Sequence, residues 1–203
     1  MHRLVYVAVA TVLTLAGAVP ANAAPLLRTA PSVAVAAQPL TTTTDVLSVW
    51  GAGPYRIGAS LDRLTAAGMI ESPVATCDGV VRAGATGTWA GVILLAFRHG
   101  RLVEVNTATA PPYSPAGAGV GMSFADLETI YGPRGSLISN DAGTATAYLV
   151  RVGARVELFT GHPIRPGVGA FQVGTASFVE RDFRQGGTCR GRQARLLAGL
   201  RPS

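Results

Sequence analysis

A ten-residue pattern that occurs twice constrains this chain more than any other feature of its sequence. Residues 98–107 (RHGRLVEVNT) align without a gap on residues 151–160 (RVGARVELFT), matching at Arg, Gly, Val, Glu and Thr. In each copy the glycine separates two β-rich runs, and the preceding runs are 92–97 and 146–150. The pattern predicts two equivalent antiparallel hairpins. A bulged turn is favoured in the first, because a two-residue turn would set two arginines opposite each other.

A second pattern, also present twice, predicts a short helix before each hairpin. Residues 57–64 (IGASLDRL) and 120–127 (VGMSFADL) share a β-branched residue, a glycine, a serine and a leucine in the same order. Ser60 and Ser123 are natural N-caps, because a serine hydroxyl can accept a hydrogen bond from a free backbone N–H of the first turn. Apolar residues then recur at three- and four-residue steps, and each helix is expected to end at a glycine. These glycines are Gly68 and Gly132.

Together these patterns predict an α+β fold class, in which two tandem repeats of a short helix plus antiparallel β-strands form one domain. The domain covers residues 46–190, with repeat units at about 54–110 and 117–183 and three strands expected in each. The helix patterns are 63 positions apart (57 to 120) and the hairpin patterns 53 (98 to 151), so the first unit carries ten more residues between them. The run 176–183 is expected to be the last strand.

The pattern at 120–127, with its closing Gly132, resembles the helix opening of β-lactamase-inhibitor-protein-like and BamE/SmpA-like domains. The resemblance covers two short motifs, and it implies a helical segment that precedes an antiparallel sheet. In the inhibitor proteins such units occur in tandem, each with an internal disulfide. This chain departs from that arrangement in its cysteines, and it has Ala59 where the methionine of the motif would lie. An inhibitory or outer-membrane-assembly function does not follow from a shared fold.

The N-terminal segment of the chain indicates a secreted, extracellular protein. Residues 1–23 have a charged start, an uncharged apolar run and an Ala-x-Ala exit, which is the pattern of a cleaved signal peptide. An uncleaved anchor is the alternative, but the run is shorter than the ~20 residues that span a bilayer, so no stable membrane insertion is expected. Residues 24–45 are predicted to be a flexible Ala/Pro/Thr-rich spacer, with glycosylation left open. Residues 191–203 are predicted to be a basic disordered tail, and contact with anionic envelope polymers is left open.

Two cysteines, Cys77 and Cys189, are predicted to form a disulfide, because an even pair in an oxidising compartment is most simply a bridge. The bridge would close a loop of more than 100 residues. The chain-entropy model assigns such a loop about 4–5 kcal/mol of stabilisation. Metal binding and a reactive thiol are the alternatives, although neither cysteine has a second ligand at the usual spacing.

The formal net charge of +6 belongs largely to the C-terminal tail. Residues 46–189 hold 11 arginines and 10 acidic residues, whereas residues 190–203 hold four arginines and no acid. A nucleic-acid-binding domain carries its basic surface on the fold itself, so nucleic acid is not expected as a partner.

Few side chains of the chain suggest chemistry, and no recognised catalytic, metal or phosphate-binding motif is present. No cofactor and no metal are therefore expected. His162, with Arg165 nearby in the Gly/Pro-rich loop 161–169, is the best candidate for a binding site. His99 is expected to be a surface turn residue.

Three further residues are weaker candidates for binding. Glu104 and Glu157 are expected to be solvent-facing strand residues, each near an arginine. The alternative is that they approach each other across a continuous sheet and act as a carboxylate pair. Trp89 is expected in the core or at a sheet edge, and the alternative is a ligand platform.

These features favour a secreted, non-enzymatic binding or inhibitor-like module that engages an extracellular or cell-envelope protein through a sheet face or the 161–169 loop. A second hypothesis is an unrecognised secreted enzyme in which His162, Arg165 and Glu157 converge at one cleft. A third is a structural cell-envelope protein. The sequence leaves the partner and the oligomeric state open.

Overall fold

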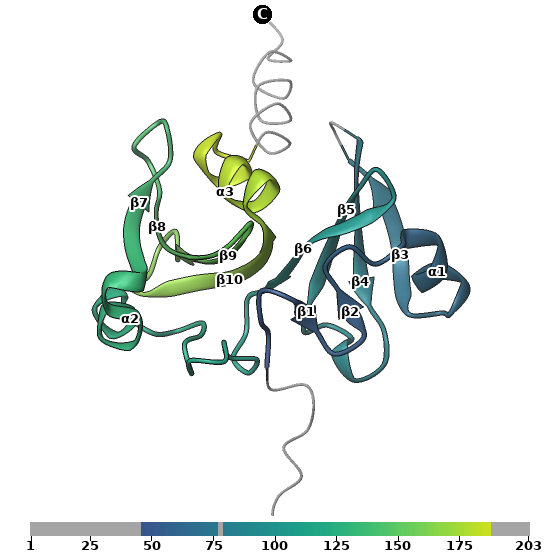
Figure 1. Cartoon of the computed structure of the whole chain (residues 1–203), viewed down its shortest axis with the longest axis horizontal. Coiled ribbons are helices and arrows are strands. Elements are labelled where there is room, and N and C mark those ends of the chain that lie inside the picture. Colours follow the sequence, from purple (N-terminus) through teal and green to yellow (C-terminus); the bar gives the residue numbers. More distant parts are fainter. Residues whose placement is uncertain (1–45, 77–78, 188–203) are drawn as a thin grey trace, which may run out of the picture. The chain divides into compact units, whose positions relative to one another are not determined.

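In the computed structural model of the chain, residues 46–76 and 79–187 are described (Figure 1). The predicted signal peptide (1–23), the spacer and the tail lie outside the described residues, as do Cys77 and Cys189. The predicted disulfide therefore stays a prediction.

The centre of the fold is an eight-stranded antiparallel sheet in the order β3-β4-β5-β6-β10-β9-β8-β7. Two further short strands form a separate ribbon, and three α-helices and two short 3-10 helices complete the described structure. The strands are β1 (Gly51–Ala52), β2 (Tyr55–Arg56), β3 (Ile70–Ala75), β4 (Val80–Ala85), β5 (Leu94–Arg98), β6 (Arg101–Thr107), β7 (Gly135–Ser139), β8 (Thr146–Val152), β9 (Arg155–Gly161) and β10 (Val168–Thr175). The helices are α1 (Leu61–Ala66), η2 (Gly87–Trp89), α2 (Phe124–Tyr131), η3 (Gly132–Arg134) and α3 (Ala176–Arg184).

The two halves of the sheet have the same order of elements. In each half a short helix, α1 or α2, is followed by four antiparallel strands, where the sequence predicted three. The halves meet at β6 and β10, the fourth strand of each, which pair antiparallel. The predicted α+β fold class, with short helices and antiparallel strands, is confirmed.

The predicted equivalence of the two hairpins is wrong by one strand. Residues 98–107 belong to the β5–β6 hairpin, the third and fourth strands of their half, whereas 151–160 belong to β8–β9, the second and third. The alignment therefore does not support the predicted tandem repeats. It matched turn chemistry, which is local and recurs wherever a glycine closes a hairpin.

The predicted bulge in the first hairpin turn is also misplaced. Arg98 lies opposite Arg101, and His99 and Gly100 both have positive φ (50° and 70°), as a two-residue turn requires. The irregularity falls further along the pair, between Ala96 and Phe97.

The run 176–183 is helix α3, not the expected last strand. Phe178 and Val179 are buried against the sheet. Glu180 forms ion pairs with Arg184, one turn later in α3 (3.0 Å), and with Arg151 of β8. An apolar face and an i,i+4 ion pair both favour a helix. The ion pair between Glu180 and Arg151 connects that helix to β8.

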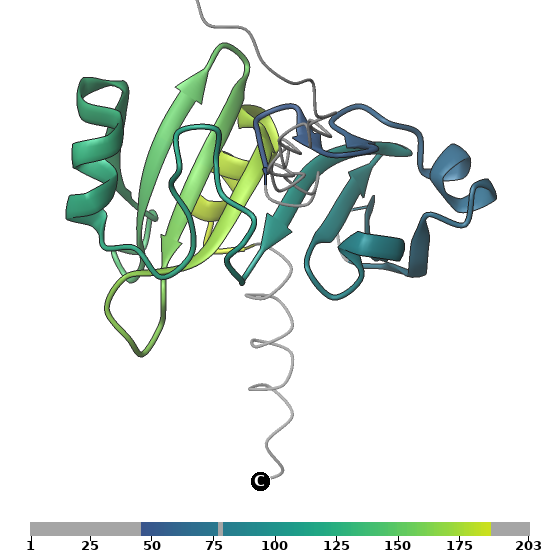
Figure 2. The same cartoon turned by 90° about the horizontal axis from the view of Figure 1, so that it is seen from below.

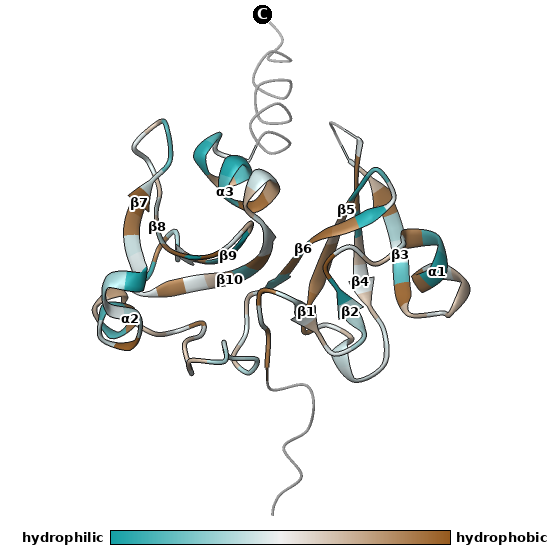
Figure 3. Cartoon of the chain, in the orientation of Figure 1, coloured by the Kyte–Doolittle hydropathy of each residue, from teal (hydrophilic) through white to brown (hydrophobic). Residues whose placement is uncertain are grey.

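Each face of the sheet packs over part of its area against a separate core. One core contains α2, the β1–β2 ribbon and the rings of Phe159 and Phe171, which stack with centroids 4.3 Å apart. The other contains α3. Figures 1 and 2 show α3 and α2 on opposite sides of strands β8–β10, and Figure 3 shows apolar residues along the central strands.

A single glycine lets α3 approach the seam between the halves. Gly174 of β10 lies opposite Glu104 of β6. A Cβ on Gly174 would lie 2.8 Å from Val179 Cγ2 and would also overlap the Val103 carbonyl. A larger residue would therefore displace either the helix or the strand.

We expect Gly174→Ala to lower the free energy of unfolding by about 1–3 kcal/mol, the usual cost of overpacking. The matched control is Gly84→Ala in the same sheet, where a Cβ meets nothing closer than 3.8 Å. That variant should change stability by less than about 0.5 kcal/mol or raise it slightly. Urea denaturation measures both, and equal effects would contradict the close contact.

Candidate functional site

The connection between β9 and β10 is a closed loop, residues 162–167 (HPIRPG). The N–H of His162 donates to the carbonyl of Gly167 (2.9 Å), which closes the loop. At its base, the N–H of Val168 donates to Met122 O (2.8 Å) and the N–H of Gly121 donates to Val168 O (2.9 Å). These bonds hold the loop against the segment that precedes α2.

The imidazole of His162 organises the loop from inside. Its Nδ1 accepts hydrogen bonds from the backbone N–H of Ile164 (3.2 Å) and of Arg165 (3.1 Å). Because Nδ1 is an acceptor, the neutral ring carries its proton on Nε2. The guanidinium of Arg165, 3.3 Å from Nε2, therefore lies beside another donor. The side chain of His162 holds the loop backbone.

Two further features limit the freedom of this loop. Pro163 and Pro166 restrict the backbone φ on either side of its tip. Gly169 lies directly under His162, since a Cβ at Gly169 would be 2.7 Å from His162 Cα. The loop is therefore pre-organised.

The tip of the loop presents an apolar side chain that sequence reasoning missed. Ile164 is 86% exposed, the highest value among the large exposed hydrophobic residues of the described part, where the next is Leu94 at 60%. Arg165, beside it, is also exposed. The sequence feature that could have indicated an exposed apolar tip is the position of Ile164 between Pro163 and Pro166.

Glu157 is not the solvent-facing residue that the sequence predicted, because it is only 6% exposed. Tyr131 of α2 donates a hydrogen bond to Glu157 Oε2 (2.5 Å), and the Tyr131 hydroxyl lies 2.7 Å from Ser114 Oγ. Since the tyrosine proton goes to the carboxylate, the serine donates to the tyrosine oxygen. Burial raises the pKa of Glu157, and the Tyr131 hydrogen bond and the charge of Arg134 act against that rise.

Glu104 is also buried, at 2% exposure, and it lies on the opposite face of the sheet. Directly paired residues of an antiparallel sheet share a face. Glu104 pairs with Gly174 under α3, whereas Glu157 pairs with the neighbouring Val173. The two glutamates therefore cannot form the carboxylate pair that was the alternative prediction. The nearest cation recorded for Glu104 is Arg82, with Nη1 3.8 Å from Oε1.

The remaining candidates lie apart from the loop. Trp89 is 3% exposed in η2, within the core as the sequence predicted. His99 is exposed in the β5–β6 turn, also as expected.

The structure does not bring His162, Arg165 and Glu157 to one cleft. His162 follows the end of β9, five residues beyond Glu157, and strand geometry spaces them by about 16 Å. Glu157 is bonded to Tyr131 inside the protein, whereas Arg165 is in solvent. The geometry gives no proton-transfer arrangement of these three groups.

Within residues 46–76 and 79–187 no three His, Cys, Asp or Glu side chains gather closely enough to hold a metal ion. Among the same residues, no helix has the length and apolar character needed to cross a bilayer.

No protein-family model and no curated protein matches the chain. Solved structures with a distant similarity include a cysteine-rich secretory protein from Staphylococcus aureus (TM-score 0.40, 12% identity) and an extracellular SCP-domain protein from Bacillus anthracis (TM-score 0.41, 14% identity). These matches cover 61% and 64% of this chain and 46% of each of those chains. A DUF4309 family protein from Bacillus subtilis matches with a TM-score of 0.37 and 14% identity, over 61% of this chain and 84% of that one.

We expect Glu157→Gln to remove a pH-dependent cost of folding. A carboxyl whose folded pKa lies above its unfolded value binds more protons in the native state, so its contribution to stability falls as pH rises through the window that starts at about 4.3. The free energy of unfolding of Glu157→Gln relative to the native sequence should therefore increase between about pH 4 and 7. Urea denaturation across that range measures the difference.

A second variant tests whether the pH dependence of stability comes from the buried carboxyl of Glu157. Tyr131→Phe removes the hydrogen bond that lowers the pKa of Glu157. It should cost about 1–3 kcal/mol, and more at neutral than at acid pH. A stability difference for Glu157→Gln that is constant with pH would contradict the raised pKa.

We expect His162→Ala to loosen the loop without unfolding the protein. Backbone order parameters of Ile164 and Arg165 should fall from about 0.85 to below about 0.6, while global stability changes by less than about 1 kcal/mol. NMR relaxation measures the order parameters. Arg165→Ala, which keeps the backbone donor, is the control and should leave them unchanged, and equal loosening would mean that Nδ1 does not hold the loop.

Proposed function

We propose that this protein is a secreted, non-enzymatic binding module, inhibitor-like in character, that docks on a partner through the 162–167 loop. The observation that carries the proposal is an isoleucine, 86% exposed, at the tip of a loop whose backbone is held by its own histidine.

Pre-organisation is the physical reason for choosing the loop. Ordering a flexible segment on binding costs free energy, and a segment held beforehand in one conformation avoids that cost. Interfaces also depend on a few anchors that enter pockets of the partner. Ile164 supplies such an anchor, and Pro163 and Pro166 restrict the backbone around it.

The chemistry of the loop suggests the chemistry of the partner. Ile164 suits an apolar recess, and the exposed guanidinium of Arg165 suits a carboxylate at the rim of that recess. Residues 1–23 support export, so the partner would be an extracellular or cell-envelope protein. A structural role in the envelope is the competing function, and it would keep the protein in the wall fraction.

The test is affinity capture from the culture medium and the cell envelope of the producing cell, using the native protein and an Ile164→Ala variant. The matched control is Leu94→Ala, which truncates another exposed apolar side chain, on β5. We expect one partner protein to be captured by the native protein and by Leu94→Ala, but not by Ile164→Ala. With that partner purified, Ile164→Ala should weaken binding by about 2 kcal/mol, or roughly 30-fold in Kd.

Two results would overturn the proposal. The first is a partner that binds all three proteins equally, because the docking surface would then lie elsewhere. The second is a protein that captures no partner and remains with the wall, which would favour the structural role.

A further inference from the structure

The eight-stranded sheet ends in two outer strands, β3 and β7, and their open edges differ. An outer strand leaves a row of backbone N–H and C=O groups unpaired, and proteins usually protect such an edge with a proline, a charge or a bulge. The β3 edge has all three, because it contains Pro73, the exposed Glu71, and a register shift between Glu71 and Val74. It is therefore a poor template for another strand.

The β7 edge has none of these protective features. Its sequence, GSLIS (135–139), contains no proline and no charged residue, and its pairing with β8 runs without a register shift. Leu137, at the centre of the strand, is 48% exposed. Figure 1 shows β7 at the left margin of the sheet, with no further strand beside it among the described residues. This is therefore the edge to which another strand can be added.

Alternate residues of β7 turn their backbone groups to this edge, because in an antiparallel pair only every second residue bonds to the neighbouring strand. The N–H of Asn140, directly after β7, donates across the hairpin to Ala145 O (3.0 Å). Counting back from Asn140, the residues whose N–H and C=O groups face outward are Gly135, Leu137 and Ser139. Apart from the N–H of Gly135, which donates to Gly132 O, these outward groups make no bond to another described segment.

The β7 edge is complementary to itself. A twofold axis at Leu137 would pair β7 antiparallel with the β7 of a second copy of the chain. This pairing sets Leu137 opposite Leu137 and Gly135 opposite Ser139, so the outward-facing residues of the two copies meet one another. In a strand that pairs with its own copy, a charged residue near the axis would face a like charge, and β7 has none.

The residues that flank β7 add complementary charge. Arg134 directly precedes the strand and Asp141 follows it closely, and both side chains are exposed. Neither forms an ion pair within the described residues. About an axis at Leu137 the start of one β7 meets the end of the other, so Arg134 lies near Asp141 of the second copy. The twofold axis repeats this contact, and the charges favour a second copy as the occupant of the edge.

We propose that β7 is the contact edge of a homodimer, in which two copies of the chain pair antiparallel about Leu137 and form one continuous sheet. The paired strands are short, so the contact belongs to the weak, reversible class of interfaces. Such a dimer carries two 162–167 loops, and a partner with two binding sites would be held more tightly by it. The edge and the loop are independent, so either proposal can fail without the other.

The test is sedimentation equilibrium of the full chain, in which we expect monomers and dimers with a Kd of about 10 µM. Leu137→Lys sets two lysines opposite each other and should weaken the dimer at least about tenfold. The matched control is Val74→Lys, on the other outer strand, where the valine is 59% exposed. That variant should dimerise as the native protein does. Both positions are exposed, so neither substitution should unfold the monomer.

A charge reversal tests the position of the axis without changing the central residue. Arg134→Glu and Asp141→Arg should each weaken the dimer by about fivefold, because each brings like charges together at both copies of the contact. The double variant restores opposite charges and should dimerise as the native protein does. Hydrogen exchange of the Leu137 and Ser139 amides should also slow as the protein concentration rises through the Kd.

The proposal is overturned if the native protein stays monomeric well above that concentration, or if Val74→Lys weakens the dimer as much as Leu137→Lys does. It is also overturned if the double charge reversal dimerises no better than the single variants. Leu137 and Ser139 amides that are protected equally at every concentration would mean that another part of the same chain covers the edge, and this result would overturn the proposal as well.

Discussion

The antiparallel pairing of β6 with β10 is the interaction on which the rest of the structure depends. Four cross-strand pairs, from Phe171–Thr107 to Gly174–Glu104, join two four-stranded halves into one sheet. Without this seam each half would expose a long strand edge, which proteins normally cover or interrupt. The seam also assigns the faces, because Val105 and Val173 enter one core while Glu104 and Gly174 lie under α3 in the other.

The sequence predicted the helix starts and the hairpin turns correctly, because interactions between residues close in sequence determine them. Ser123 caps α2 and forms a capping box with Asp126, as the serine pattern indicated. Ser60 occupies the same position before α1, although its hydroxyl makes no capping bond. The turns at Gly100 and Gly153 fall where the glycines predicted them, at positive φ.

The assignment of strands to places in the sheet could not be read from those signals. A glycine turn indicates that two consecutive strands pair, but it does not indicate their position within a four-stranded half. The ten-residue alignment therefore equated β5–β6 of one half with β8–β9 of the other, which are not equivalent. The glutamates failed for a related reason. Alternation along a strand places every second residue in water only when one face of the sheet is wet. Here α3 covers part of the second face, and Glu104 and Glu157 are both buried on opposite sides.

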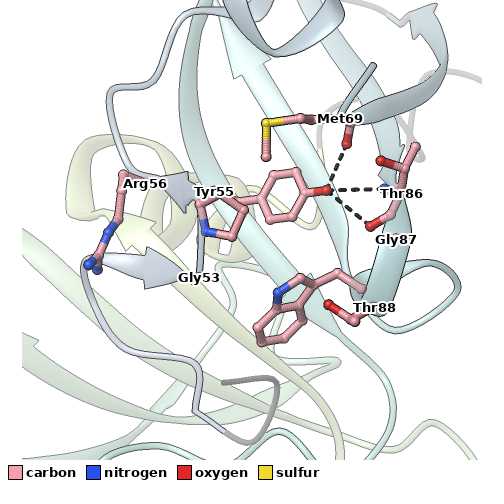
Figure 4. Close-up of a pocket in the computed structure, with 9 residues that line it drawn as sticks. Gly53, Tyr55, Arg56, Met69, Thr86, Gly87 and Thr88 are labelled. Atoms are coloured by element: carbon pink, nitrogen blue, oxygen red, sulfur yellow. Dashed lines mark hydrogen bonds between the residues drawn. The ribbon is translucent and has the colours of Figure 1, made fainter. Parts of the chain in front are cut away.

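For the candidate loop, the sequence indicated the segment but not the directions of its side chains. Glycine, proline and histidine pointed to residues 161–169, but only the structure shows His162 turned inward, which leaves Ile164 as the side chain that a partner would meet. The Tyr55 hydroxyl is a second case, because it bonds to the backbone of Met69 and of Thr86, which are far from it in sequence (Figure 4).

The places of the acidic groups bear on what such a scaffold can do. Glu104, Glu157 and Glu180 are all buried, and their recorded contacts are to Arg82, to Tyr131, and to Arg151 and Arg184. A general acid or base must reach a substrate within a hydrogen bond or one water, and these three carboxylates are engaged inside the fold, where Glu157 and Glu180 join α2 and α3 to the sheet.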